Sequence, residues 1–320
     1  MLPSRSRALL CALSLLLIAC GGPGARTTAD TVRVATEAAT AGPIDLTDDL
    51  GATIHLTRPA KRIVSLIPSA TESLIAIGAA PLLVGRTRYD TASAIASIPS
   101  VGGGIDPSLE AIVQLEPDLV VGWGTDARAG LRARLASAGI PMFSLATEDT
   151  SDIFRGIRNL GRLTGRDSAA GDVARSIRAT LDSVRQSVAG KPTPRVMYVV
   201  FADPPMTAGP RTFIGQLIGL AGGKSIFDDV SANWPNVAME EIVRRDPDLL
   251  IVPVGEFKQN TLERFRGLAG WRSLRAVRDR RVVAVSADLL SRPSPSIAQS
   301  AKVLRDAIHP DLVSAAPGAR

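Results

Sequence analysis

Two segments of this chain repeat one pattern, and the repeat limits which folds the chain can adopt. Residues 109–122 and 239–252 align without a gap, and six of their fourteen positions are identical. Each copy is typical of a short helix, a Pro-Asp turn and then an apolar run that suits a buried strand. The same unit therefore occurs once in each half of the chain, which predicts two related lobes.

Buried strands alternate with helices along both halves. We expect a hairpin at 44–56 and a last helix from about 296 to 308, with buried strands at 62–66, 82–85, 119–122, 142–145, 195–201, 249–252 and 282–285. This alternation predicts an α/β fold in which helices cover both faces of parallel or mixed sheets.

The middle of the chain has a helical period instead. Apolar residues recur every three or four positions, first at Ile153, Ile157, Leu160 and Leu163, and after Gly165 at Val173, Ile177, Leu181, Val184 and Val188. We therefore predict an N-terminal lobe at 44–150, a helical spine at 151–191 and a C-terminal lobe at 192–312.

The first nineteen residues have the layout of a secretory signal peptide. Their apolar run, Leu9 to Ala19, is too short to span about 30 Å of hydrocarbon. It ends in a small residue before Cys20, which resembles the lipobox of bacterial lipoproteins. We expect Cys20 to carry lipid after cleavage, against the alternative of an ordinary signal peptide with a chance cysteine. Residues 20–43 are expected to be a flexible tether and 313–320 a tail. The chain would then lie in the periplasm or cell envelope, attached to the membrane only by its lipid.

Composition argues against several other classes of protein. Cys11 leaves with the signal, so the mature chain has no disulfide. The precursor carries a net charge of +6, but its basic residues do not form a run with interspersed aromatic residues, so the sequence does not indicate nucleic-acid binding. His55 and His309 lie far apart in the sequence, which argues against a zinc site. We expect a monomer with no metal and no cofactor of its own.

Ser69 and Thr71 are the candidates for a nucleophile that the sequence offers. No Gly-x-Ser-x-Gly elbow surrounds them and no histidine is placed to partner them. We therefore predict that they cap a helix from about 68 to 77, which Gly78 can end, and that the chain is not an enzyme.

Several motifs resemble one family. They are the run Arg-Ile-Val-Ser-Leu-Ile-Pro-Ser-Ala-Thr-Glu at 62–72, Asp-Pro-Ser-Leu-Glu at 106–110 and Pro-Asp-Leu-Val at 117–120. These resemble the helical-backbone (class III) periplasmic binding proteins of ABC importers. Within that group the chain is most similar to the cobalamin-binding members, through the segments at 201–209, 234–237 and 292–295. The resemblance covers residues 60–312, nearly all of the mature body.

The resemblance implies two rigid lobes with a ligand groove between them and little closure, because a helical spine tolerates little bending. It implies capture of cobalamin or a related corrinoid and delivery to a permease dimer with ATPase subunits. Haem or a ferric siderophore on the same scaffold stays open as the alternative. For an anionic siderophore, the groove would need arginines, and the candidates are Arg86, Arg88, Arg211 and Arg292.

Aromatic residues are only 4% of the chain, so their positions are informative. Tyr89, Trp123 and Phe201 each follow or end an expected strand, where ligands bind in open α/β sheets. The resemblance places ligand contacts at Tyr89, Trp123, Phe201, Trp234 and Asp288, with Arg292 nearby. The cobalamin-binding members carry a further Trp where this chain has Gly102 to Gly104, so part of the wall is absent or supplied by Ile105.

Glu110 and Glu240 occupy the same place in the two copies of the repeat. We expect Ile112, Val113, Ile242 and Val243 to face inward and both glutamates to lie on the exposed face. A favourable helix dipole is the simplest explanation for each acid alone. Paired acids on two related lobes also suit a symmetric permease dimer that presents arginines, and the family uses glutamates at these places for docking.

Overall fold

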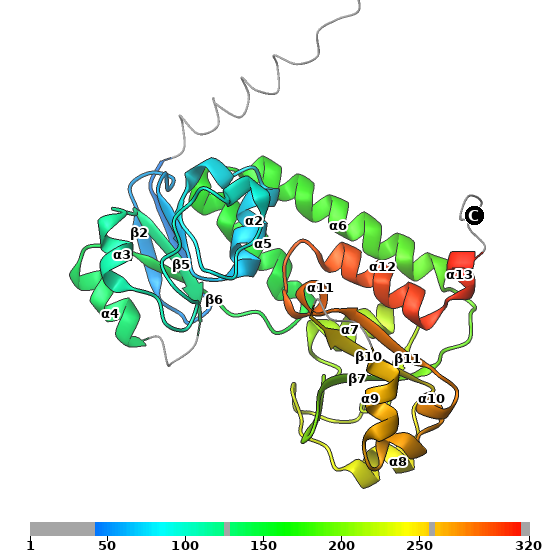
Figure 1. The fold of residues 1–320 in the computed structure, drawn as a ribbon. Coiled ribbons are helices and arrows are strands. Elements are labelled where there is room, and N and C mark those ends of the chain that lie inside the picture. Colours follow the sequence, from blue (N-terminus) through cyan, green and yellow to red (C-terminus); the bar gives the residue numbers. More distant parts are fainter. Residues whose placement is uncertain (1–41, 125–128, 256–259, 315–320) are drawn as a thin grey trace, which may run out of the picture.

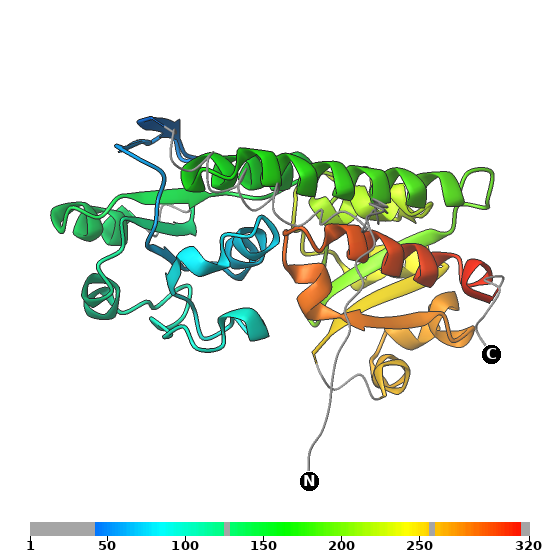
Figure 2. The same ribbon diagram turned by 90° about the horizontal axis from the view of Figure 1, so that it is seen from above.

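The structure is a computed structural model that describes residues 42–124, 129–255 and 260–314. Two α/β lobes lie side by side, and a long helix runs along both of them (Figures 1 and 2). This is the predicted architecture. Cys20, the signal peptide and nearly all of the expected tether lie outside the described residues.

The N-terminal lobe is built on a parallel sheet with the strand order β4-β3-β5-β6, formed by β3 (Ile63–Ser65), β4 (Leu83–Gly85), β5 (Leu119–Trp123) and β6 (Met142–Leu145). Alternate residues of β5 face opposite ways. Leu119 and Val121 pack in one apolar cluster with α2 (Pro68–Ala76) and the spine. Val120 packs in another with α3 (Leu109–Gln114) and α4 (Ala129–Ser137). Helices therefore cover both faces of this sheet. The predicted hairpin is β1 (Ile44–Thr47) and β2 (Thr53–Leu56).

The C-terminal lobe has a mixed sheet with the strand order β11-β10-β7-β8, and β9 pairs with β7. Its strands are β7 (Arg195–Ala202), β8 (Pro205–Thr207), β9 (Lys224–Ser225), β10 (Leu249–Val254) and β11 (Val282–Ser286). Only β8 runs antiparallel to its neighbour. The helices around the sheet are α7 (Phe213–Leu220), α8 (Met239–Arg245), α9 (Thr261–Gly267), α10 (Arg275–Arg278), α11 (Ala287–Ser291), α12 (Ile297–Ile308) and α13 (Asp311–Ser314).

The spine contains two helices that fold back on each other. A capping box at Asp149 begins α5 (Thr150–Thr164), and Gly165 ends it in the left-handed conformation with φ 64°. The following helix, α6 (Asp167–Ser187), has 21 residues and is therefore about 31 Å long. It lies along both lobes (Figure 2) and packs against α5 and α12.

The repeat persists in the hydrogen bonding of the two lobes. Asp118 accepts a hydrogen bond from the backbone N–H of Arg62, just before β3 (3.0 Å). Asp248 accepts the equivalent bond from the backbone N–H of Arg195, at the start of β7 (2.8 Å). Glu116 and Asp246, two residues earlier in each copy, both have positive φ, 43° and 38°. The turn that connects helix to strand is therefore the same in both lobes.

The prediction that Ser69 and Thr71 cap a helix was wrong. Helix α2 begins at Pro68 and its N-cap residue, Ile67, has no side-chain cap. Proline is well suited to the first turn because it has no N–H to satisfy there. Thr71 instead lies within the helix and donates to Ser65 Oγ (2.9 Å). Gly78, with φ 74°, follows the end of α2 as expected.

Candidate ligand-binding groove

The carboxyl ends of the parallel strands in both lobes face a groove of about 690 Å³ between the lobes. This volume lies within the range of small-molecule binding sites, roughly 300–1,000 Å³. Six aromatic residues line it: Tyr89, Trp123, Tyr198, Phe201, Phe213 and Trp234. Both tyrosines of the chain and two of its three tryptophans are thus in one place.

Of the six predicted ligand residues, the groove brings together Tyr89, Trp123, Phe201, Trp234 and Arg292. The four aromatic ones expose 40–59% of their surface. Large aromatic side chains left in contact with solvent and gathered in one groove are typical of a binding surface. The sixth, Asp288, lies in the first turn of α11 and is not among the residues that line the groove; it is largely exposed and accepts from Arg292 Nη2 at 3.0 Å.

Tyr89 is held by a short turn and by a neighbouring ion pair. The guanidinium carbon of Arg88 lies 5.2 Å from the centre of the Tyr89 ring. Arg88 Nη2 in turn donates to Asp106 Oδ2 at 2.8 Å. The turn itself is fixed by Asp90, whose carboxylate accepts from the backbone N–H of Thr87 at 2.7 Å.

The same ion pair lies against Gly103, one of the glycines at 102–104. A Cβ atom on Gly103 would lie 2.1 Å from Asp106 Oδ1, and one on Gly104 would lie 2.8 Å from Leu66 O. A side chain at Gly104 would collide with the main chain, and one at Gly103 would displace the Arg88–Asp106 pair. Ile105 does not replace the family's aromatic residue, because it is 86% exposed and is not among the residues that line the groove.

Trp234 is held in place by contacts on either side of it. The main-chain oxygen of Asn233 accepts from Gly209 N at 2.7 Å, and a Cβ atom on Gly209 would lie only 2.1 Å from Ala232 O. The side chain of Asn233 donates to Glu148 Oε2 (2.9 Å), which enters from the other side of the groove. The loop that carries Trp234 is therefore attached to both lobes.

Tyr198 is the main lining residue that sequence reasoning missed as part of the groove. It lies in the middle of β7, is 4% exposed, and its hydroxyl is bonded to Ser291. Burial raises the pKa of this phenol well above its ordinary value, outweighing the bond to Ser291. The groove wall here is therefore neutral. The available signal was that Tyr198 lies in the same strand as Phe201, three residues before it.

The described lining carries two charged side chains, Glu148 and Arg292. Arg292 Nη1 donates to Glu72 Oε1 at 3.0 Å and its Nη2 donates to Asp288, so its charge is matched by two carboxylates. The other candidate arginines do not line the groove: Arg86, Arg88 and Arg211 donate to Asp90 O, Asp106 and Ser231 O.

Glu110 and Glu240 are exposed, one on α3 and one on α8. Glu110 does not cap its helix, since Ser108 Oγ accepts from Ala111 N (3.1 Å).

Ile112 and Ile242 are fully buried as predicted, but the same prediction for Val113 and Val243 was wrong: they are 40% and 41% exposed. Successive helical residues point about 100° apart, so two neighbours cannot both face a narrow core.

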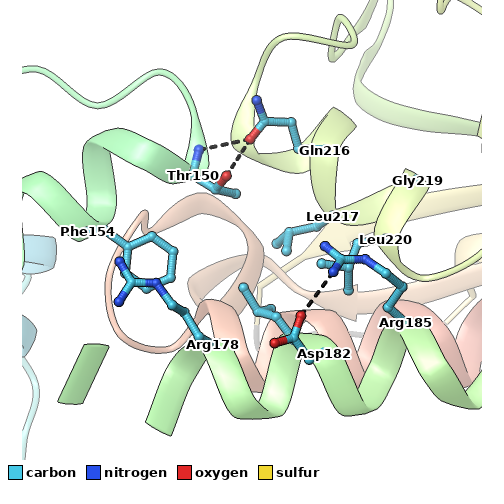
Figure 3. A pocket seen from close by; sticks show the side chains of 10 residues that line it. Thr150, Phe154, Arg178, Asp182, Arg185, Gln216, Leu217, Gly219 and Leu220 are labelled. Carbon is cyan, nitrogen blue, oxygen red and sulfur yellow. Dashed lines mark hydrogen bonds and ion pairs between the residues drawn. The ribbon is translucent and has the colours of Figure 1, made fainter. Parts of the chain in front are cut away.

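A second hollow of about 690 Å³ lies between the spine and α7 (Figure 3). Its rim is already engaged: Arg178 stacks on Phe154 at 4.5 Å, and Arg185 Nη1 donates to Asp182 Oδ1 at 2.9 Å. Gln216 reaches across it to Thr150. None of the described strands contributes a residue to this hollow, so the groove between the lobes is the stronger candidate for a ligand site.

The sequence was compared with known families and structures. The family model described as periplasmic binding protein matches residues 63–289. The chain belongs to this family. This periplasmic binding protein is thus a solute-binding component of an ABC transporter. Members of its family bind substrates for transport rather than converting them. A cobalamin-binding protein of Halobacterium salinarum is 30% identical to it over 275 residues, which is 83% of this chain and 74% of the relative.

Two solved structures share the fold of this periplasmic binding protein. A possible iron-binding (periplasmic solute-binding) protein of Staphylococcus epidermidis is 26% identical with a TM-score of 0.71, covering 79% of this chain and 100% of that one. The periplasmic vitamin B12-binding protein of Vibrio cholerae is 25% identical with a TM-score of 0.65, covering 81% and 99%.

Two features are absent from the described part of this periplasmic binding protein. No cluster of three or more His, Cys, Asp or Glu side chains suited to a metal ion occurs there. None of the helices in the same residues combines the length and apolar character that crossing a membrane requires.

Proposed function

We propose that the protein is an exported lipoprotein that captures cobalamin or a related corrinoid and delivers it to an ABC importer. The observation that carries this is a groove of about 690 Å³ whose walls are aromatic and whose lining cation, Arg292, is already paired. A corrin ring is wide and flat, with neutral amides at its edge, so it suits apolar walls with few charges. The ligands in the names of the Halobacterium relative and the Vibrio structure agree with this choice.

The charge of the groove argues against an anionic cargo. A tris-catecholate or a haem with two propionates would bind most tightly to cations that are free to pair with it. Among the described lining residues, Arg292 is the cation, and Glu72 and Asp288 accept hydrogen bonds from it. An anion would have to compete with these carboxylates and would also meet Glu148.

Haem or a ferric siderophore is the second candidate cargo, and Tyr89 is the observation in its favour. Its half-exposed phenol lies in the groove with the Arg88 guanidinium beside its ring. Tyrosine is one of the side chains that bind haem iron directly. A single such residue supports this class less strongly than the aromatic walls support a corrinoid.

For delivery, we propose that Glu110 and Glu240 dock onto the two halves of a permease dimer. Each is exposed on a short helix, and α3 and α8 belong to different lobes (Figure 1). Beside each acid the repeat presents a valine with nearly equal exposure, Val113 and Val243. Each lobe thus offers an acid and an apolar side chain, which fits a symmetric partner with a basic and an apolar group on each half.

Cys20 is the proposed lipid attachment site, on the evidence of the apolar run and small residue before it. Metabolic labelling with an azide-bearing fatty acid should mark the wild-type protein and not a Cys20→Ala variant. Equal labelling of both would remove the anchor from the proposal and leave the cargo unaffected.

The test of cargo is calorimetric titration of the chain from Gly42 onward with cyanocobalamin, haemin and a ferric catecholate. We expect saturable one-to-one binding of cyanocobalamin that is tighter than binding of either iron chelate. Binding of an iron chelate with no heat from cyanocobalamin would assign the groove to the second cargo class.

A further inference from the structure

The two lobes are joined by polar contacts at two places apart from the spine itself. At the first, the segment entering α5 meets the C-terminal lobe: Glu148 Oε2 accepts from Asn233 Nδ2 (2.9 Å). Beside it, Gln216 Oε1 of α7 accepts from Thr150 N (3.0 Å) and from its hydroxyl (2.6 Å), as Figure 3 shows for Gln216 and Thr150. At the second, α2 of the N-terminal lobe meets the segment between α11 and α12 of the C-terminal lobe. Glu72 is the residue of α2 that makes this contact.

Both carboxylate oxygens of Glu72 are used across the lobe boundary. Oε1 accepts from Arg292 Nη1 at 3.0 Å, and Oε2 accepts from Ser294 Oγ at 2.5 Å. Arg292 Nη2 also donates to the main-chain oxygen of Tyr89 at 3.3 Å, again across the boundary. We call Glu72, Arg292 and Ser294 the clasp.

The clasp is more protected from water than a surface ion pair. The side chains of Arg292 and Glu72 are 21% and 29% exposed, and Ser294 is fully buried. Exposed ion pairs contribute little to stability, whereas charged hydrogen bonds in partly buried sites are stronger. Pro293 and Pro295 restrict the backbone on either side of Ser294, so the segment that carries both donors to Glu72 is held in place.

We propose that Glu72 is a positioning residue that sets both the width and the charge of the groove. It sets the width because it ties α2 to the segment that carries Arg292, on the opposite lobe from Tyr89. It sets the charge because it neutralises the lining arginine and thereby disfavours anionic chelates. This inference rests on the groove being the ligand site, but not on the cargo being a corrinoid.

The width is tested without any ligand. The chain from Gly42 onward contains no cysteine, so Ser137→Cys on α4 and Ser273→Cys in the C-terminal lobe can be spin-labelled selectively; both positions are exposed. In pulsed electron paramagnetic resonance, we expect Glu72→Ala to broaden and shift the distribution of distances between the two spin labels. Asp288→Asn is the matched control, because it removes a carboxylate partner of Arg292 on the same lobe and should leave the distances unchanged.

The charge is tested with two probes, cyanocobalamin and haemin. Releasing Arg292 from Glu72 should lower the ratio of the haemin Kd to the cyanocobalamin Kd by about tenfold, since hydrogen bonds to charged groups contribute about 1.5–3 kcal/mol. Glu72→Gln keeps the shape and removes the charge, so it should change this ratio even if Glu72→Ala folds poorly. A charge-reversed pair, Glu72→Arg with Arg292→Glu, should restore the wild-type distances.

Unchanged distances and an unchanged ratio in both Glu72 variants would overturn the proposal. Altered distances with neither probe bound would support the clasp and count against the proposed cargo, so the two failures can be told apart.

Discussion

Replacing Trp234 with alanine measures how much of the groove's aromatic wall the ligand covers. Trp234 is 40% exposed. A tryptophan has up to about 250 Å² to bury, so about 100 Å² remains for a ligand to cover. At about 25 cal/mol per Å² this is worth about 2.5 kcal/mol, or about 60-fold in Kd. A corrinoid that covers only half of this area should still bind about tenfold more weakly to Trp234→Ala.

The assay is calorimetric titration of both proteins with cyanocobalamin. Ile105→Ala is the matched control, because Ile105 is the more exposed apolar residue, at 86%, yet lies outside the groove. Its Kd should equal the wild-type value. Thermal unfolding should show that Trp234→Ala is folded, since the loop is held by Asn233 and Gly209 rather than by the indole.

An unchanged Kd in Trp234→Ala, with cyanocobalamin still bound, would refute the reasoning. It would mean that the ligand contacts Trp123 and Phe201 without reaching the loop that carries Trp234. The loop would then be a structural link between the lobes, through Asn233 and Glu148, and not a wall of the site.

Three further results are expected. Glu110→Arg combined with Glu240→Arg should leave ligand binding intact and abolish uptake in a transport assay, whereas normal uptake would remove the docking proposal. Asp48→Asn should lower the free energy of unfolding by about 3 kcal/mol in urea titrations, because the fully buried carboxylate accepts from Arg132, Ala52 N and Ser144 N. Asp45→Asn is the control, because Asp45 is exposed. Burial alone would raise the pKa of Asp48, but those hydrogen bonds hold it below 3.8, so this difference should persist from pH 8 to about pH 5 and shrink only as the pH falls below about 4; a constant difference in acid would contradict the assignment. Burial lowers the pKa of His309 below 6.5, so the unfolded chain binds the proton more readily and the free energy of unfolding should fall as the pH drops below about 6.5. His309→Leu should flatten this dependence of the unfolding free energy on pH, and an equal dependence in both proteins would rule His309 out as its cause.

The order of strands and helices could be predicted because apolar runs and breakers are local features of the sequence. The repeat was especially informative: both copies form a helix, a turn with positive φ and a buried strand. Trp123 and Phe201 were placed correctly at strand ends for the same reason, since parallel strands bring their carboxyl ends to one edge. What failed was orientation within short helices. Val113 and Val243 were expected inside because they are apolar, but a helix of six or seven residues buries few positions.

The clasp could not be predicted because its members are 220 and 222 residues apart and no local pattern connects them. In the sequence, Glu72 stood out only as the end of the motif at 62–72, and Arg292 as a residue near the expected ligand contacts. The reason for the glycines at 102–104 could not be predicted from the sequence either. Their sequence shows only that an aromatic residue is missing, whereas the structure shows the Arg88–Asp106 pair beside Gly103 and the Leu66 main-chain oxygen beside Gly104.

The positions of the clasp and of the proposed docking residues suggest how the ligand is released. The spine, whose longer helix α6 has 21 residues, and the inter-lobe contacts at two places hold the groove at one width. Between the two lobes, the described residues contain helices rather than a hinge of extended strands that could open the groove. A partner can widen such a groove only if it binds both lobes and favours their wider arrangement. Glu110 and Glu240 belong to different lobes, and so meet this requirement. The clasp is then the contact that the partner must break, and a protein with a weakened clasp should release its ligand to the permease more readily than the wild type.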